Sequence, residues 1–419
     1  MKATRRIWFL FTLVYLVIDY GRPQDIMPPI GSLRPGALIV LVLSSFLLVK
    51  GGILMLLRNR QMMMTGAFVL LLAAYVPFAV NNYFAFMAAR TMLLYVPFIL
   101  STVICVDSVE RLKKMILVFL VLMVYISAYG ILHSGVGSGN YFKDENDLSL
   151  FINMWLPFCY FGALHEKRWT GKTLYLLAMA AGITAVVASS SRGGFLGLAC
   201  VMLVCWLYSA RKLSALVALG MLALMLYAYA GDAYWARMDT MTNTDAGTAF
   251  ERLKSWEAGW RMFLDNPLGV GGENFQVRFP EYQPDEFLRN MWGRVAHSLW
   301  FTLIPELGIP GILIYSFLLF YNLKDVFFLK GLGSLPDADR RYLHSLSLSF
   351  LASMAGYFAS GSFLSVLYYP HYWYLTALIV AAARIARQSR TAGEAPARRA
   401  AGHGILAGAP MAGIPPCRT

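Results

Sequence analysis

The sequence has little charge for its length. Of its 419 residues, 14% are Asp, Glu, Lys or Arg, whereas about 25% is usual in a soluble domain. Hydrophobic residues make up 58% and the mean hydropathy is +0.56. The charged residues stand in groups between long apolar runs. This pattern excludes a large soluble protein and predicts a membrane protein with several spans.

Cysteine is also scarce, and its spacing carries no motif. The chain has five cysteines, of which four lie in apolar runs and Cys417 lies near the C-terminus. No two are spaced as CxxC, so neither a zinc site nor a disulfide framework is indicated. We expect them to be small buried hydrophobic side chains.

Apolar runs of suitable length predict about twelve transmembrane helices. The first run is followed by Asp19-Tyr20-Gly21-Arg22 and not by a cleavage site of small residues, so we expect it to be retained. The predicted fold class is an all-α polytopic membrane protein. Its predicted spans are residues 7–20, 36–56, 66–82, 91–106, 115–133, 148–164, 173–189, 193–210, 213–230, 297–321, 344–366 and 370–386.

The basic residues predict which way the chain crosses the membrane. With the N-terminus in the cytoplasm, 24 of the 36 Lys and Arg residues fall on the cytoplasmic side, as the positive-inside rule requires. Both termini are then cytoplasmic. The net charge of +13 thus reflects topology, and it calls for no nucleic-acid partner.

Four regions follow from this topology. Residues 1–230 hold helices 1–9, residues 231–296 form a large, partly helical loop on the opposite side, and residues 297–386 hold helices 10–12. Residues 387–419 are rich in Ala, Gly, Pro and Arg and are predicted to be a disordered cytoplasmic tail. The loop has seven basic and ten acidic residues, so it is not a general polyanion-binding surface.

The loop contains one predicted amphipathic helix. In residues 251–264, Trp256, Trp260 and Phe263 recur at helical spacing and share one face. Asn266-Pro267 is expected to end this helix.

Two arginines on the non-cytoplasmic side are candidate anion ligands. Arg192 lies in the tight turn Ser191-Arg192-Gly193-Gly194 between the seventh and eighth predicted spans, against the positive-inside trend. A guanidinium suits phosphate, and glycines let a ligand approach the backbone. The alternative is that Arg192 only anchors the turn at the membrane–water interface. Arg252 opens the loop helix, where a solvated helix face beside Glu251 explains it equally well.

A glycine-rich turn follows the loop helix. Residues 266–275, which include Gly271 and Asn274, form the sequence NPLGVGGENF. Such turns can present backbone N–H groups to anions. No strand precedes this one and no Walker-type lysine follows it, so the turn alone indicates little.

A histidine begins the tenth predicted span. His297 at the membrane surface, followed by Ser298, is a candidate general base for a hydroxyl, although an interfacial histidine is the commoner case. Glu306 lies deeper in the same span and must be paired or neutral there. Helix packing beside the predicted kink at residues 308–311 is its alternative role.

Acidic residues gather before the sixth predicted span. Residues 142–147 read FKDEND, and Asn146 or Asp147 is the predicted N-cap. Several carboxylates could bind a divalent cation, but helix capping accounts for them.

In their order along the chain, these motifs resemble the O-antigen ligase and polymerase superfamily of bacterial membrane glycosyltransferases. Four segments carry the resemblance. They are DENDLSLFINMWLPF (144–158), SSSRGGFLGL (189–198), ERLKSWEAGWRMFLDNPLGVGGENF (251–275) and AHSLWFTLIPELGIPG (296–311).

The resemblance implies a reaction. A glycan on undecaprenyl pyrophosphate is transferred to an acceptor hydroxyl at the periplasmic face of the bacterial inner membrane, without a nucleotide sugar. Because arginines can neutralise the pyrophosphate as a metal would, we expect no metal and no cofactor. The resemblance implies that Arg192 and Arg252 neutralise the pyrophosphate and that His297 activates the acceptor. Further residues of the matching segments are expected to bind substrate: Ser191, Gly193, Gly271, Asn274, Ser298 and Glu306.

The acceptor stays open at this point. It is lipid A–core or another surface acceptor in a ligase, a lipid-linked repeat unit in a polymerase, and a Ser or Thr side chain in a protein O-oligosaccharyltransferase. A lipid-linked glycan flippase is the alternative function from a different class, since it is a transporter and not an enzyme. A flippase is expected to line its spans with ionisable residues. Here nearly all of the polar motifs lie on the exterior side of the membrane, and Glu306 alone among them lies within a span. An enzyme is therefore favoured.

Overall fold

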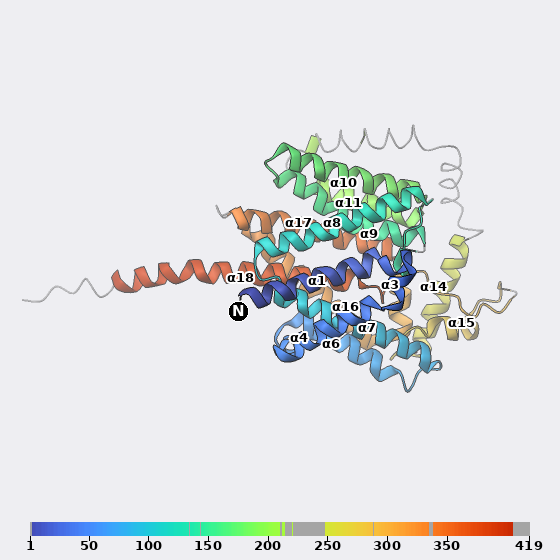
Figure 1. The fold of residues 1–419 in the computed structure, drawn as a ribbon. Coiled ribbons are helices and arrows are strands. Elements are labelled where there is room, and N and C mark those ends of the chain that lie inside the picture. Colours follow the sequence, from blue (N-terminus) through green and yellow to red (C-terminus); the bar gives the residue numbers. More distant parts are fainter. Residues whose placement is uncertain are drawn as a thin grey trace, which may run out of the picture.

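The computed structural model describes residues 2–133, 135–142, 144–209, 212–213, 220, 248–287, 289–334 and 338–404. Every regular element in these ranges is a helix (Figure 1). Nearly all of the predicted ninth span, and residues 231–247 of the predicted loop, lie outside the described residues. The predicted total of twelve spans therefore stays a prediction.

Within the described ranges, each of the other eleven predicted spans falls on a helix. These helices are α1 (Lys2–Gly21), α4 (Pro35–Val49), α6 (Arg60–Tyr75), α7 (Asn82–Cys105), α8 (Val109–Leu132), α9 (Glu145–His165), α10 (Trp169–Ala188), α11 (Arg192–Leu207), α16 (Leu299–Lys330), α17 (Ala338–Gly361) and α18 (Pro370–Gly404). Shorter helices are α2 (Pro23–Ile26), α3 (Pro28–Ser32), η1 (Gly52–Leu54), α5 (Met55–Arg58), η2 (Asn140–Phe142) and η3 (Gly331–Ser334).

Six helical segments of the described chain are long and apolar enough to cross a membrane. They are Pro29–Val49, Asn82–Cys105, Val109–Leu132, Glu145–His165, Trp169–Ala188 and Leu299–Lys330. Their length and composition support a membrane protein, and the part of the chain that the structure describes is helical throughout its regular elements.

Helix α9 lies at the centre of the bundle. It packs against α8, α10, α11 and α17, and every residue from Asn146 to Cys159 is buried. Trp155 stacks on Phe119 with ring centroids 4.0 Å apart. The acidic end of α9 is thereby held firmly at one end of the bundle.

The predicted second span is too long. Helix α4 ends at Val49, because Gly51 takes the left-handed conformation with φ 63°. A glycine adopts this conformation without steric cost and ends the helix there.

The boundary between the third and fourth predicted spans is also wrong. Helix α6 ends at Tyr75, and α7 begins at Asn82 with the Asn81 side chain accepting a hydrogen bond from Phe84 N–H at 3.1 Å. Arg90, which falls between these two predicted spans, lies inside α7 and is exposed. The turn between these helices contains apolar residues, so hydrophobicity alone does not distinguish the turn from a transmembrane span.

The N-cap of α9 lies earlier than predicted. Asp144 caps the helix by accepting a hydrogen bond from Asn146 N–H at 2.7 Å. Asn146 and Asp147 are already inside the helix, so the prediction that one of them is the cap is wrong.

The C-terminal tail is helical where it is described. Helix α18 continues to Gly404 and projects from the bundle (Figure 1). Residues 387–404 were predicted to be disordered, but Ala and Arg have high helix propensity. Residues 405–419 lie outside the described part of the chain.

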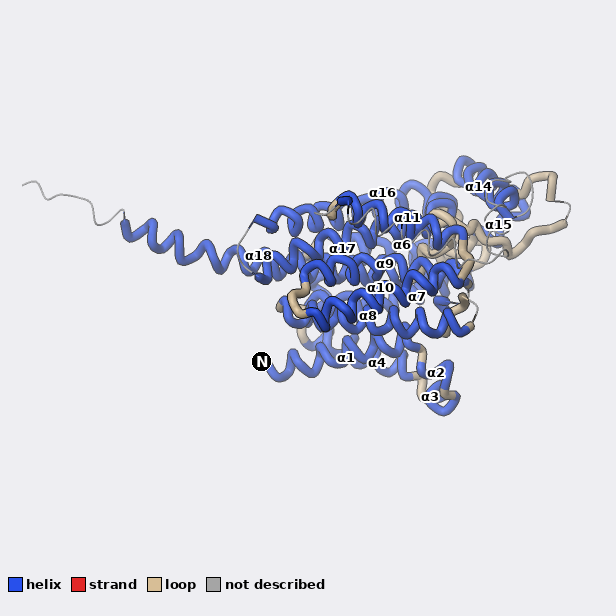
Figure 2. Tube along the Cα trace, turned by 90° about the horizontal axis from the view of Figure 1, so that it is seen from above, coloured by secondary structure: helices blue, strands red, loops and turns tan. Residues whose placement is uncertain are grey.

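Two helices of the predicted loop lie together at one end of the bundle. They are α14 (Thr248–Asp265) and α15 (Phe275–Tyr282). The N-terminus and the extension of α18 lie at the opposite end in both views (Figures 1 and 2). Helix α14 confirms the predicted helix over residues 251–264 and its end before Asn266.

The predicted aromatic face of α14 is only partly buried, since Trp256 stacks on Phe301 of α16 but other residues of the helix are buried more fully. Ser255, Ala258 and Met262 are fully buried, whereas Trp260 is 48% exposed. A side chain at Gly259 would come within 3.1 Å of Phe275. Small residues thus let α14 approach α15 and α16 closely, and Trp260 is left at the surface.

Candidate active site

The turn between α10 and α11 holds Arg192 at a helix N-terminus. Ser191 is the N-cap, and its Oγ accepts a hydrogen bond from Gly194 N–H at 2.8 Å. The same hydroxyl donates to Asn146 Oδ1 at 2.6 Å, which ties the turn to α9. Arg192 is therefore the first residue of α11, where its guanidinium and the helix dipole both favour an anion.

The glycines after Arg192 allow α11 to approach α9. A Cβ atom at Gly194 would lie 2.4 Å from the Cβ of Ser149, whereas one at Gly193 would lie 3.4 Å from Phe363 Cβ. Gly194 is thus required by packing. Gly193 has more room, and its predicted contact with a substrate stays a prediction.

Helix α14 is fastened to the segment that leads into α16. Arg294 donates to Glu251 Oε2 at 2.8 Å and to Ser255 Oγ at 2.7 Å. Trp256 donates from Nε1 to the Ala296 carbonyl at 3.0 Å. These contacts span residues 251–256 of α14 on one side and residues 294–296 on the other, so they fix Arg252 next to His297.

The predicted catalytic residues lie close enough to affect one another's charge. Burial and Arg192 both lower the pKa of Arg252 from its ordinary value. Burial, Arg252 and Arg294 lower the pKa of His297. We call Arg192, Arg252 and Arg294 the arginine cluster. Its members and His297 come from three segments, α11, α14 and the residues before α16, which meet at one end of the bundle.

Asp144 and Glu251 moderate this concentration of positive charge. Asp144 opposes the lowering of the pKa of both Arg252 and His297, and Glu251 opposes it at His297. The lowered pKa of His297 still favours the neutral imidazole near pH 7, which can accept a proton.

The backbone at His297 is unusual. Its φ is 47°, in the left-handed region that favours glycine, and such conformations gather at functional sites. Ser298, which follows, is buried and caps α16 by accepting a hydrogen bond from Phe301 N–H at 3.4 Å. Ser298 thus has a structural role, and its contact with substrate stays a prediction.

Glu306 is paired, as its depth requires, and its partners are internal. Its carboxylate is 3% exposed. It accepts hydrogen bonds from Tyr368 Oη at 2.6 Å, Glu273 N–H at 2.8 Å and Phe275 N–H at 3.1 Å. The predicted kink is confirmed at Gly308, with φ 57° and ψ −157°. Glu306 therefore anchors the glycine-rich turn to the broken helix α16.

The glycine-rich turn uses much of its own hydrogen-bonding capacity. Gly271 N–H donates to the Glu306 carbonyl at 2.8 Å. Asn274 is fully buried, and its side chain accepts from Asn81 N–H at 2.8 Å and donates to the Asn81 carbonyl at 3.2 Å. These contacts give Gly271 and Asn274 a scaffolding role; binding of substrate by them stays a prediction.

Sequence reasoning missed Arg294, Asp144 and the part played by Asn146. Arg294 precedes His297 by three residues in an irregular segment, and no periodicity marks such a position. Asn146 was considered only as a cap, although its side chain holds Ser191 of the Arg192 turn. The sequence did offer one signal for Asn146, namely that it lies in the same polar segment as Asp144.

The comparisons with known proteins concern the same part of the chain. Residues 177–316 match a family model described as O-antigen ligase. This range includes Arg192, Arg252, Arg294 and His297. None of the curated proteins matches the chain. The resemblance drawn from the sequence motifs is thus confirmed over residues 177–316.

Proposed function

We propose, from the match of residues 177–316 to the O-antigen ligase family model, that this protein transfers a glycan from undecaprenyl pyrophosphate to an acceptor hydroxyl. The acceptor is lipid A–core or another surface molecule, and the reaction takes place at the periplasmic face of the bacterial inner membrane. Both termini are then cytoplasmic, and residues 231–296 are periplasmic. The observation that carries the proposal is the convergence of Arg192, Arg252 and His297.

The arginine cluster suits a pyrophosphate leaving group. As the bond between the anomeric carbon and the phosphate oxygen breaks, negative charge develops on that oxygen. Arg192 and Arg252, which lie close enough to act on each other's charge, stabilise this charge through charge-assisted hydrogen bonds. The N-terminus of α11 adds its own positive potential at Arg192.

His297 suits activation of the acceptor. Its imidazole takes the proton from the acceptor hydroxyl while the hydroxyl oxygen forms a bond to the anomeric carbon. The carbon–oxygen bond to pyrophosphate breaks in the same step, and in-line attack inverts the anomeric configuration. Because burial, Arg252 and Arg294 lower the pKa of His297, the base form persists to a lower pH than for an ordinary histidine.

A polymerase and a protein O-oligosaccharyltransferase share this chemistry and differ in the acceptor. A strain that lacks the protein distinguishes them when its surface glycans are separated on a gel. Loss of long chains from lipid A–core, with lipid-linked polymer retained, identifies a ligase. Single repeat units identify a polymerase, and a glycoprotein of reduced mass identifies the protein-directed enzyme.

The site itself is tested by substitution in that strain. Arg192→Ala, Arg252→Ala and His297→Ala should each abolish glycan transfer while the protein still inserts in the membrane. Arg289→Ala, an exposed arginine of the same loop, is the matched control and should restore transfer. If all three site variants restore full transfer, the proposed function is wrong.

A further inference from the structure

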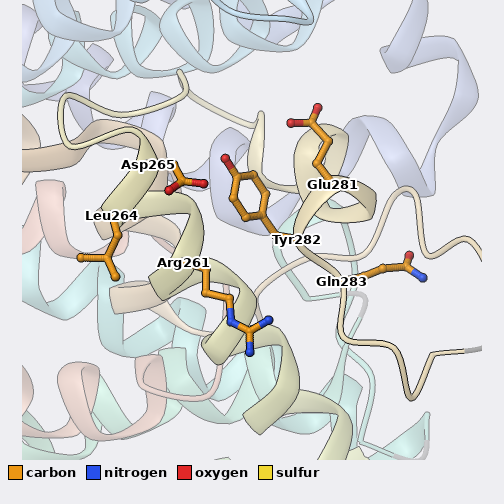
Figure 3. A pocket seen from close by; sticks show the side chains of 6 residues that line it. All are labelled: Arg261, Leu264, Asp265, Glu281, Tyr282 and Gln283. Atoms are coloured by element: carbon orange, nitrogen blue, oxygen red, sulfur yellow. The ribbon is translucent and has the colours of Figure 1, made fainter.

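A polar groove lies between the C-terminal ends of α14 and α15 (Figure 3). None of its lining residues belongs to the arginine cluster. Its volume is about 360 Å³, within the range of small-molecule clefts. Two short runs of residues line it: Arg261, Leu264 and Asp265 from α14, and Glu281, Tyr282 and Gln283 from the end of α15.

A chain of hydrogen bonds fixes the two walls of the groove. Asn266 donates from Nδ2 to the Tyr282 hydroxyl at 3.1 Å and accepts at Oδ1 from Arg278 Nη1 at 3.0 Å. Arg278 in turn donates to Glu281 Oε2 from Nε at 2.9 Å and from Nη2 at 2.7 Å. The side chains of Tyr282 and Glu281 are therefore ordered before any ligand binds, which reduces the entropic cost of binding.

The groove keeps hydrogen-bonding groups for a ligand. The Tyr282 oxygen accepts from Asn266, so its own O–H remains available to donate. The Asp265 carboxylate acts on Arg278 through its charge but makes no hydrogen bond or ion pair within the described part of the chain, so its oxygens remain able to accept. Arg261 uses Nη2 to pair with Glu257 and has further N–H groups, and Leu264 offers an apolar edge that is 60% exposed.

This combination of groups fits a saccharide. Sugar hydroxyls both donate and accept, and therefore need acceptors such as Asp265 beside donors such as Arg261 and Tyr282. The apolar faces of sugar rings can pack on Tyr282 and Leu264. Carboxylates in the wall disfavour a phosphate, and the polar lining disfavours a lipid chain.

The position of the groove indicates which sugars it would hold. Asp265 follows Arg252 by thirteen residues on the same helix, which corresponds to about 20 Å along its axis. Arg261 follows Arg252 by nine residues, on the opposite face of α14. One sugar cannot bridge these positions, but a chain of several can.

We infer that this groove binds sugar units of the lipid-linked glycan that are remote from its pyrophosphate. The inference rests on the proposed function, in which the pyrophosphate lies at the arginine cluster. A chain anchored at both places is bound through its reacting end and through its length. The groove thereby favours long donors over short ones.

Chain-length selectivity tests the inference. The full-length protein in lipid nanodiscs is given two donors, lipid-linked glycan of one repeat unit and of many, and kcat/KM is measured for each. In Asp265→Asn and Tyr282→Ala, the ratio of kcat/KM for the long donor to that for the short donor should fall roughly fivefold. Asp285→Asn, an exposed carboxylate of the same loop outside the groove, should keep the wild-type ratio.

A binding measurement separates failure of the groove from failure of the proposed function. The probe is the saccharide released by mild acid from the long donor, followed by saturation-transfer NMR. Arg252→Ala should still bind it, and Asp265→Asn and Tyr282→Ala should bind it more weakly. Wild-type binding and wild-type ratios in both groove variants would overturn the inference alone. Binding that depends on Asp265 and Tyr282, in a protein that transfers neither donor, would support the groove and overturn the proposed function.

Discussion

Two arginines at opposite ends of the bundle, Arg252 and Arg387, lie in different electrostatic surroundings. At the end that bears α14, burial and the nearby Arg192 both disfavour the charge of Arg252. At the other end, Arg387 of α18 forms an ion pair with Asp325 of α16, a carboxylate that is 4% exposed. The like charges of Arg192 and Arg252 store unfavourable energy that an anion can relieve, whereas Arg387, like Arg294 in its ion pair with Glu251, fastens two segments together. The contrast separates a binding site from a structural contact.

The largest effect is expected at Arg252. Arg252→Ala should reduce glycan transfer about 100-fold or more, because a fixed donor to developing negative charge is lost. Arg252→Lys should recover only part of the activity, since an ammonium group cannot form the bidentate contact of a guanidinium. Initial transfer rates with purified donor check both variants. Equal rates for Lys and Arg at this position would remove the case for bidentate binding.

The opposite end should respond in stability and not in chemistry. Asp325 also accepts a hydrogen bond from Gln61 Nε2 at 2.8 Å, so it joins α6, α16 and α18. Asp325→Ala leaves one N–H of the buried Gln61 amide without its acceptor, while the Tyr321 carbonyl still accepts from that amide at 3.2 Å, and the loss should cost about 1–3 kcal/mol. Thermal unfolding in detergent measures the loss. The transfer rate per folded molecule should stay near the wild-type value; a loss as large as that of Arg252→Ala would erase the distinction between the two ends.

The smallest effect concerns pH. Burial, Arg252 and Arg294 all lower the pKa of His297, whose ordinary value is about 6.5. A lowered pKa keeps the imidazole neutral as pH falls, so activity should be lost only below that ordinary value. Arg294→Gln removes one positive neighbour, while Arg252, Asp144 and Glu251 continue to act on His297. The acidic limb of the pH–rate profile should therefore move to higher pH.

The control for this prediction is Arg289→Gln, which removes an exposed arginine of the same loop and should leave the profile in place. An unchanged acidic limb in Arg294→Gln would mean that His297 is not the group that titrates, even if the rate falls.

The sequence predicted helices well and their ends less well. Long apolar runs identify spans because the bilayer imposes a length, and this holds for α8 to α10. It fails where apolar residues also form a turn, as between Tyr75 and Asn82. It fails again at Gly51, where the backbone and not hydrophobicity ends the helix.

The sequence predicted the site residues that belong to a local pattern, but not those whose role depends on contacts with residues far away along the chain. Arg192, Arg252 and His297 each belong to a segment with a recognisable pattern, and the structure brings all three together. Arg294 has no pattern of its own, since its importance arises from Glu251 and Ser255, which lie some forty residues earlier. Likewise, the internal partners of Glu306 could not be inferred, because they come from α15 and from the residues before α18.

The most direct test of the account is reconstituted transfer. Purified protein in liposomes is supplied with undecaprenyl-pyrophosphate-linked glycan and lipid A–core in the presence of EDTA, and the product is followed over time. The account predicts product from the wild type, without added metal, and none above background from Arg192→Ala or Arg252→Ala. Product formed at the wild-type rate by both variants would contradict it.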